Sequence, residues 1–331
     1  ITGDVVPVFF HYAVPSIIGI LAATSAGVID GIFIGNFVGA SALAAVNIYM
    51  PAFYLFAAVV FMLAVGGSVM CGKFLGEKNL ASASAIFSKT LYAVLAVSGI
   101  IVALSLFFLD QVVALLGANE DLHNMVRDYI QIILWASPLL IMGLTLDYFV
   151  RVDGRPVLAS FALVAFAASN IVLDWVFIVL WGWGLKGAAY ATAISEAAIL
   201  LILVTHLFNA RCTLRLVPVP MRWKDGWDSV FQAAYNGFSE FANEMSLALI
   251  TLLFNWVMIT RLGVSGVAAF TIIGYLLMIG LEVCYGISDS LQPTVSKNLG
   301  ARQPDRIVRF TITAVISSFT IGLIVSTLFI L

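Results

Sequence analysis

The stretch GASALAAVNI at residues 39–48 recurs 224 residues further along the chain as GVSGVAAFTI at residues 263–272. The same offset, without a gap, aligns CGKFLGEKN (71–79) with VSKNLGARQ (295–303). Each copy is therefore a long apolar segment that ends in a short polar turn containing glycine. A unit that occurs twice predicts a fold that arose by duplication and has two related halves.

The composition identifies the environment of these segments. Hydrophobic residues make up 62% of the 331 residues, charged residues only 10%, and the mean hydropathy is +1.07. Soluble domains carry about 25% charged residues, so this chain cannot present an ordinary wetted surface. Charge-free runs such as 5–29 and 90–109 are long enough to cross roughly 30 Å of hydrocarbon. We expect an all-α polytopic membrane protein, because these runs are continuous rather than alternating as in barrel strands.

The apolar runs predict nine membrane helices, and the basic residues between them predict their orientation. Of the 16 Lys and Arg residues, all but Arg127, Lys186 and Arg261 fall in alternate connections. The positive-inside rule then places the N-terminus in the cytoplasm. The expected helices are 7–36, 41–72, 84–109, 123–150, 157–181, 186–208, 230–260, 265–298 and 307–331.

The span count also predicts how the two copies are related. Six helices separate them, so both have the same orientation, as in transporters whose halves are related by an axis along the membrane normal. The second copy lacks counterparts for about three helices, so we expect a whole protein of roughly 450 residues in two six-helix lobes. The expected division is an N-terminal lobe (1–208), a cytoplasmic linker (209–229) and the first three helices of the second lobe (230–331).

Acidic residues inside apolar runs are the candidates for function. A charged side chain at the bilayer centre costs roughly 2.5–3.5 kcal/mol on insertion scales, so it usually faces protein or water. Asn170 and Asp174, in NIVLDWVF, are spaced i, i+4 and share a helix face. Asp30 lies in the outer half of the first helix, as Asp174 does in the fifth, and the repeat places Phe254 at the position equivalent to Asp30.

These three residues predict a cation site. Two carboxyl groups in a poorly hydrated pocket favour a shared proton, and with the Asn170 carbonyl they offer hard oxygen ligands for sodium. The alternative is a hydrogen-bonded cluster that only locks two helices together. Glu244, Glu282 and Asp289 form a second candidate polar site in the other half, where their equivalents under the repeat are not acidic.

Other classes of function have little support in the sequence. No phosphate-binding glycine loop is present, the three cysteines have no metal-binding spacing, and no basic block suggests a nucleic-acid partner. We expect no cofactor other than a coupling ion, H⁺ or Na⁺, and no enzymatic activity. Two alternatives remain: a flippase of lipid-linked oligosaccharides, which would favour a cationic interior, and an intramembrane aspartyl protease using Asp30 and Asp174.

Several motifs in order resemble one family. Pro15, the VID at 28–30, GASALAAVNIYMP (39–51), NIVLDWVF (170–177) and the repeated glycine turn are similar to the multidrug and toxic compound extrusion (MATE) transporters, and most similar to their bacterial drug-efflux branch. The resemblance implies a V-shaped pair of six-helix lobes in the bacterial cytoplasmic membrane. It also implies proton- or sodium-driven export of organic cations and amphipathic drugs, in contact with membrane lipid.

The resemblance further implies roles for individual residues. Asp30, Asn170 and Asp174 match the family's cation site in the first lobe, and Tyr129 matches a tyrosine of the same site. Pro15 matches the proline at which the family's first helix bends. Another branch carries a glutamate in helix seven, whose position here falls near Ala248, so that role is not transferred to the neighbouring Glu244.

Overall fold

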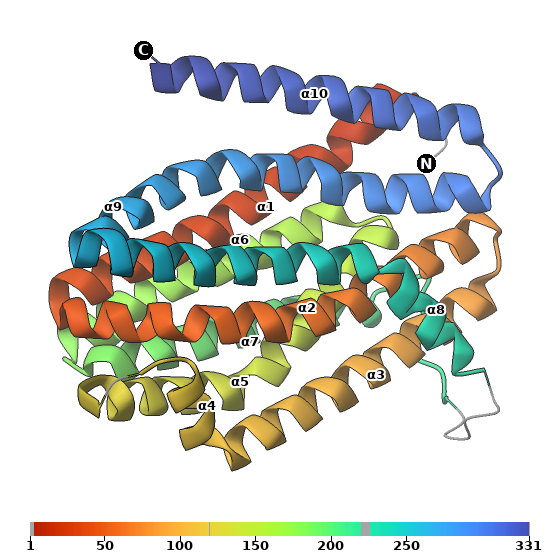
Figure 1. The fold of residues 1–331 in the computed structure, drawn as a ribbon. Helices are drawn as coiled ribbons and strands as arrows, with labels where there is room; N and C mark the ends of the chain where they lie inside the picture. The colour runs from red at the N-terminus through yellow and green to blue at the C-terminus, as the bar shows by residue number, and fades with distance from the viewer. Residues whose placement is uncertain (1–2, 119, 220–225, 331) are drawn as a thin grey trace.

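The computed structural model describes residues 3–118, 120–219 and 226–330, with the backbone alone for most of 252–280, including the second repeat copy at 263–272, and for the last residues of the chain. The predicted linker, 209–229, therefore lies partly outside the described residues. The described chain is almost entirely helical (Figure 1). Its elements are α1 (Val5–Phe33), η1 (Ile34–Val38), α2 (Ala40–Gly76), α3 (Leu80–Phe107), α4 (Leu109–Leu115), α5 (Glu120–Val152), α6 (Pro156–Asp174), η2 (Trp175–Leu180), α7 (Gly184–Leu207), α8 (Asp228–Asn236), α9 (Phe238–Gly300) and α10 (Pro304–Ile330).

Seven helices in the described part are long and apolar enough to cross a membrane. They are α1 with the π-helical segment η1, α2, α3, α5, α6 with the π-helical segment η2, α7 and α10, and their positions match seven of the predicted helices. The prediction of an all-α polytopic membrane protein is confirmed. Helices α1 to α7 pack against one another as a bundle, and α9 packs against α1 and α2.

The structure differs from the predicted helices in three places. The expected break between residues 260 and 265 is absent, because α9 is helical without interruption from Phe238 to Gly300. The proline of this helix, Pro293, lies far from the expected break, and residues 260–265 contain none. In an apolar environment a continuous helix keeps its backbone groups hydrogen-bonded. The helix predicted from residue 230 begins instead as the separate α8, which ends before Gly237, and the short α4 lies in what was expected to be a loop.

Helix α9 nevertheless doubles back on itself. A straight helix of 63 residues would be about 95 Å long. Yet a Cβ at Gly237, before its first residue, would meet Met62 of α2, and a Cβ at Gly300, its last residue, would meet Lys73 of the same helix. Met62 and Lys73 are separated by only about 16 Å of helix. Both ends of α9 therefore lie against one half of α2, and Figure 1 shows the helix reversing direction between them.

The contact between α2 and the end of α9 joins positions that the repeat makes equivalent. The Ser68 hydroxyl donates to Gln292 Oε1 at 3.2 Å, and these residues are 224 apart in sequence. A Cβ at Gly76 would collide with the carbonyl oxygen of Lys297, and a Cβ at Gly300 with that of Lys73. Because 76 and 300, like 73 and 297, are equivalent under the same offset, the contact is reciprocal. Such reciprocity is the geometry of a local two-fold axis between two parallel copies.

The turns after the two helices are also the same. Lys78 and Arg302, again 224 residues apart, both adopt left-handed backbone conformations, with φ of 59° and 54°. The next residue in each turn donates its N–H back five residues at 2.9 Å, from Asn79 to Phe74 and from Gln303 to Asn298. This is the Schellman arrangement that satisfies the last carbonyls of a helix. The repeated glycine turn seen in the sequence therefore closes both helices in the same way.

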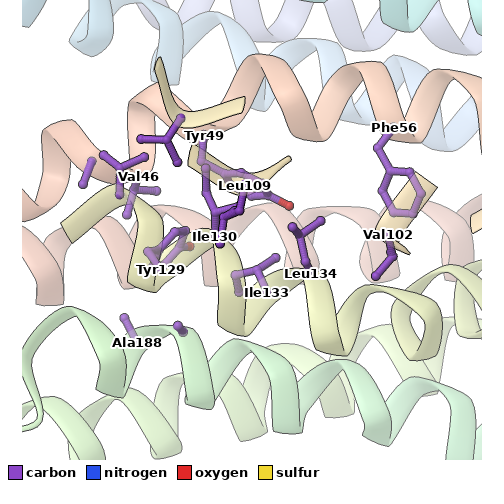
Figure 2. Packing of buried hydrophobic residues seen from close by; sticks show 14 of the residues in the cluster. Val46, Tyr49, Phe56, Val102, Leu109, Tyr129, Ile130, Ile133, Leu134 and Ala188 are labelled. Atoms are coloured by element: carbon purple, nitrogen blue, oxygen red, sulfur yellow. The ribbon is translucent and has the colours of Figure 1, made fainter. Parts of the chain in front are cut away.

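The interior of the bundle is filled by side chains from α2, α3 and α5 (Figure 2). Phe56 of α2 lies next to Val102 of α3, and Tyr129 and Ile130 of α5 lie beneath Tyr49 of α2 in the same view. Close packing of this kind fixes the rotation of each helix about its axis. The orientation of the polar side chains described below follows from that packing.

Candidate functional site

Helices α1 and α6 run side by side in the same direction, and a glycine brings them close. A Cβ at Gly19 of α1 would lie 3.1 Å from Leu163 Cδ1 and 3.2 Å from Ser160 Cα of α6. Asp30 follows Gly19 by eleven residues, and Asp174 follows Leu163 by eleven. Each acid is thus about 16 Å along its helix from the same contact, so the two carboxyl groups arrive at the same level.

The side chains of Asp30 and Asp174 meet at hydrogen-bonding range. Asp174 is fully buried, with 0% of its surface exposed, and Asp30 is partly buried. Among the described residues, no donor reaches Oδ1 of Asp30 or either carboxyl oxygen of Asp174. A buried carboxylate without donors is costly, and two facing each other repel. A proton or a small cation between them would remove both penalties, so the chemistry of this pair fits such an ion.

Asn170 lies one helical turn before Asp174 and is also buried, with 2% exposed. Its amide nitrogen is 3.5 Å from the hydroxyl oxygen of Thr192 on α7, the outer limit of a hydrogen bond. Asn170 shares the buried face of α6 with Asp174, so its carbonyl oxygen is a candidate neutral ligand beside that acid. The structure therefore brings together the three residues predicted for the cation site, and adds α7 to the helices that surround them.

Tyr129 is placed at the same site. It is 5% exposed and lies within electrostatic range of both Asp30 and Asp174. Its ring packs edge-on against Tyr49 of α2, with 5.8 Å between the ring centres (Figure 2). Tyr129 thus lies near the carboxyl pair, as expected, and Tyr49, which the sequence did not single out, is its packing partner.

A further acid, which the sequence did not assign to the site, lies near the tyrosines. Glu196 of α7 is 4% exposed, and its Oε2 has no donor among the residues that the structure describes. It lies near Tyr49 and Tyr129. The signal that could have placed it is its i, i+4 spacing from Thr192 on α7.

Both helices that carry the acids continue as π-helices. η1 begins four residues after Asp30, and η2 begins directly after Asp174. Their wide turns are closed by bonds five residues apart, from the Gly39 and Trp181 N–H groups, each at 2.9 Å. The two π-helical segments lie against each other. Such turns are rare and occur frequently at functional sites, and no periodicity in the sequence predicted them.

The acids of the second candidate polar site lie along α9 and are all partly buried. The charges of Glu240 and Glu282 act on Glu244, and the Thr24 side chain of α1 hydrogen-bonds to Glu282. Asp289 is within electrostatic range of Arg151 on α5. These acids thus form one group on α9. The group lies near α1 and α5 of the first bundle and includes Glu244, Glu282 and Asp289.

Arg151 connects α5 to the first helix near its proline. It is 2% exposed, and its guanidinium donates to Asp147 through Nε at 2.7 Å and through Nη2 at 3.2 Å. Nη1 donates to the Ser16 hydroxyl of α1. Helix α1 continues unbroken through Pro15, which sits directly before Ser16. Any bend of α1 at Pro15 would therefore move Ser16 relative to a buried ion pair.

Comparison with known proteins identifies sequence relatives. The MatE family profile matches residues 15–176 and 241–331, more than half of the chain. Multidrug export protein MepA of Staphylococcus aureus (strain MSSA476) is 24% identical over 301 residues, which are 90% of this chain and 66% of MepA. MepA of Staphylococcus haemolyticus (strain JCSC1435) is 28% identical over 204 residues, 62% of this chain and 45% of that protein. The chain therefore spans less than two thirds of these relatives.

Solved structures share the fold. A crystal structure of MATE in complex with MaD3S superposes with a TM-score of 0.89 at 24% identity, covering 98% of this chain and 73% of the other. A MOP superfamily transporter from Pyrococcus furiosus Vc1 (DSM3638), described as having a binding pocket of reverse polarity, superposes with a TM-score of 0.88 at 25% identity, covering 98% and 71%. With the family profile, the matched motifs and the shared fold in agreement, this chain belongs to the MatE family.

Proposed function

We propose that the protein is an antiporter of the bacterial cytoplasmic membrane that exports organic cations and amphipathic drugs in exchange for H⁺ or Na⁺. The observation that carries the proposal is the pair formed by Asp30 and Asp174, whose buried oxygens have no donors among the described residues. Relatives named multidrug export proteins support the drug cargo.

The coupling ion would bind between the two carboxyl groups, with Asn170 as a neutral ligand and Tyr129 beside them. An ion drives transport only if it binds the two conformations with different affinity. The pair is shared between α1 and α6, so its affinity for the ion depends on how closely these helices approach. A movement of α1 relative to α6 would therefore change the affinity of the pair for the ion. Ion binding and the change of conformation would be linked in this way.

Pro15 offers a place where α1 could move. Proline removes one helical hydrogen bond and favours a bend. The next residue, Ser16, is held by Arg151, which is held in turn by Asp147. In this proposal the ion pair anchors the inner end of α1, while the outer end that carries Asp30 follows the state of the cation site. The V-shaped arrangement of two lobes, 1–208 and 230–331, belongs to the same proposal.

The cargo class follows from charge. Glu240, Glu244, Glu282 and Asp289 gather on the side of α9 that faces α1 and α5. A group of acids attracts cationic ligands and disfavours the pyrophosphate of a lipid-linked sugar. Arg151, a buried arginine nearby, is neutralised by Asp147. These charges favour drug export over the flippase alternative, and membership of the MatE family argues against the aspartyl protease.

The proposal predicts gradient-dependent efflux. Proteoliposomes that contain the purified protein are loaded with ethidium, and a proton gradient or a sodium gradient is imposed separately. We expect at least one of the two gradients to drive ethidium movement that protein-free liposomes do not show. Movement that is the same with and without either gradient would contradict ion coupling, and no movement under any gradient would contradict ethidium export by this protein.

The proposed orientation, with the N-terminus in the cytoplasm, predicts which residues can be labelled from outside. Single cysteines are introduced at Lys78, Arg215 and Leu115 after the exposed Cys284 is changed to serine. In intact cells a membrane-impermeant maleimide should label Leu115→Cys, which lies in α4 and is 87% exposed in the wild type. Lys78→Cys and Arg215→Cys should react only after the membrane is permeabilised. Labelling of either from outside would overturn the orientation.

A further inference from the structure

Three buried side chains with metal-binding groups meet where α5 and α7 end. Asp153 lies in the turn between α5 and α6, His206 at the end of α7, and Cys212 in the segment that follows α7. One carboxyl oxygen, one imidazole nitrogen and the thiol sulfur all lie within 4.8 Å of one another. The Asp153 and His206 side chains are 1% and 2% exposed, and Cys212 is 4% exposed. Three such groups from separate segments are rarely buried together by chance.

The surrounding chain holds each group in place. His206 Nε2 is 2.7 Å from Asp153 Oδ2, which also accepts the Thr213 N–H at 3.0 Å, and the Thr213 hydroxyl donates to Oδ1. Burial alone raises the pKa of Asp153, but the hydrogen bonds from His206 and Thr213 outweigh it and hold that pKa below its usual value. The Asp153 carboxyl is therefore ionised and oriented. Cys212 is positioned by a turn in which its N–H donates to the Asn209 carbonyl at 3.0 Å.

We propose that Asp153, His206 and Cys212 form a zinc-binding site. Thiolate, imidazole and carboxylate together are ligands that Zn²⁺ accepts, whereas Mg²⁺ and Ca²⁺ prefer all-oxygen sites. Zinc bonds of about 2.0–2.3 Å place tetrahedral ligand atoms roughly 3.3–3.8 Å apart. His206 Nε2 and Asp153 Oδ2, now 2.7 Å apart, would therefore separate slightly, and all three groups already lie within 4.8 Å of one another. Three protein ligands leave the fourth position to water. The bonds from Thr213 to the carboxyl are the outer contacts that ligating carboxylates usually have.

Binding would exchange protons for the ion. The Cys212 thiol, which donates to the Leu214 carbonyl at 3.1 Å, would lose its proton to solvent, and the resulting thiolate would bind zinc. Zinc would also replace the direct contact between His206 and Asp153. The His206 ring keeps a second nitrogen, Nδ1, which is buried and has no partner among the described residues. A cavity of about 410 Å³ lined by residues that include His11, Tyr12 and Asp153 reaches the site from one side.

The position of the site indicates what a bound zinc would do. It would join the turn after α5, the end of α7 and the segment that follows α7. That segment is already fixed to α3, because the Arg215 and Val217 N–H groups donate to the hydroxyl oxygens of Ser84 and Ser88 at 3.1 Å and 2.9 Å. Zinc would add a second attachment and hold the start of the connection to α8 against the first bundle. This inference does not depend on what the protein transports.

Metal content of the purified protein tests the site. The protein is prepared in detergent without a histidine tag, stripped with a chelator, and dialysed against Zn²⁺ or Co²⁺. We expect one tightly held Zn²⁺ per chain, a higher unfolding temperature with zinc, and a thiolate-to-cobalt absorption band in the Co²⁺ form. Cys212→Ser should remove the band and weaken zinc binding by at least about 10-fold.

Two further variants make the outcome decisive. Cys284→Ser removes an exposed thiol on α9 and should leave zinc affinity and the cobalt band unchanged. His206→Gln should weaken zinc binding to a similar extent as Cys212→Ser. The unfolding temperature of each variant without metal shows whether it is folded. A folded wild type that retains no zinc, or equal zinc affinity in the wild type and Cys212→Ser, would overturn the proposal.

Discussion

Asp174→Asn should reduce ion-driven ethidium efflux to the background rate of protein-free liposomes while the amount of folded protein stays near the wild-type level. Asparagine keeps the shape of the side chain but can neither carry a charge nor exchange a proton. Asp174 is fully buried and has no hydrogen-bond donor among the described residues, so a neutral replacement removes a desolvation cost rather than a favourable contact. Efflux in proteoliposomes and size-exclusion profiles of the same preparations measure the two quantities.

Three matched variants separate a cation site from a general effect of removing polar groups. Asp30→Asn should have the same effect, because either carboxyl group alone leaves an incomplete pair. Asn170→Ala should weaken transport less, since it removes a neutral ligand and a marginal contact with Thr192. Asp110→Asn should transport normally: this acid is exposed on α4 and pairs with Arg127 at 2.8 Å. If Asp30→Asn and Asp174→Asn both transport ethidium at the wild-type rate at all external pH values and sodium concentrations, the cation site is wrong. The three polar residues would then serve only to lock the two helices together.

The sequence was sufficient to predict most of the spans because bilayer thickness sets a minimum length for charge-free runs. It failed at α9, where the expected break around residue 261 does not interrupt the helix. The reversal of α9 depends on its contacts with α2 at Met62, Lys73 and Gly76, and such contacts between distant segments leave no local pattern. The sequence offset shows that Gly76 and Gly300 are equivalent positions. It does not show that the two copies of the repeat contact each other, so the reciprocal contact could not be predicted.

The candidate site was predictable where residues shared both a helix face and a depth. Asp30 and Asp174 met this condition, and the glycine contact between α1 and α6 explains why they meet. Glu196 was missed, because its i, i+4 spacing from Thr192 does not by itself show that this face of α7 packs against α6. The group formed by Asp153, His206 and Cys212 was not predictable either. His206 lies 53 residues after Asp153, and only the packing of α7 against α5 brings the two together.

Gly76→Ala should lower the stability of the folded protein by about 1–3 kcal/mol, the usual cost of forcing extra atoms into a packed interface. A Cβ at this position would overlap the carbonyl oxygen of Lys297 and lie 2.9 Å from its carbonyl carbon. The obstacle is helix backbone rather than the end of a flexible side chain, so α2 and α9 must separate to accommodate it. The thermal unfolding temperature in detergent, followed by the fraction of protein remaining monodisperse, measures the loss.

The matched control is Gly99→Ala on α3, where an added Cβ would meet nothing within 4 Å. Because it only removes backbone freedom, it should leave stability unchanged or raise it by about 0.4–1 kcal/mol. Gly300→Ala should cost as much as Gly76→Ala, since it would overlap Lys73 in the reciprocal contact. The double variant should cost less than the two single losses combined, because one separation of α2 from α9 relieves both overlaps. Full additivity would show that the two glycines act at independent contacts, and a Gly76→Ala protein as stable as Gly99→Ala would show that the close approach of α2 and α9 is not required.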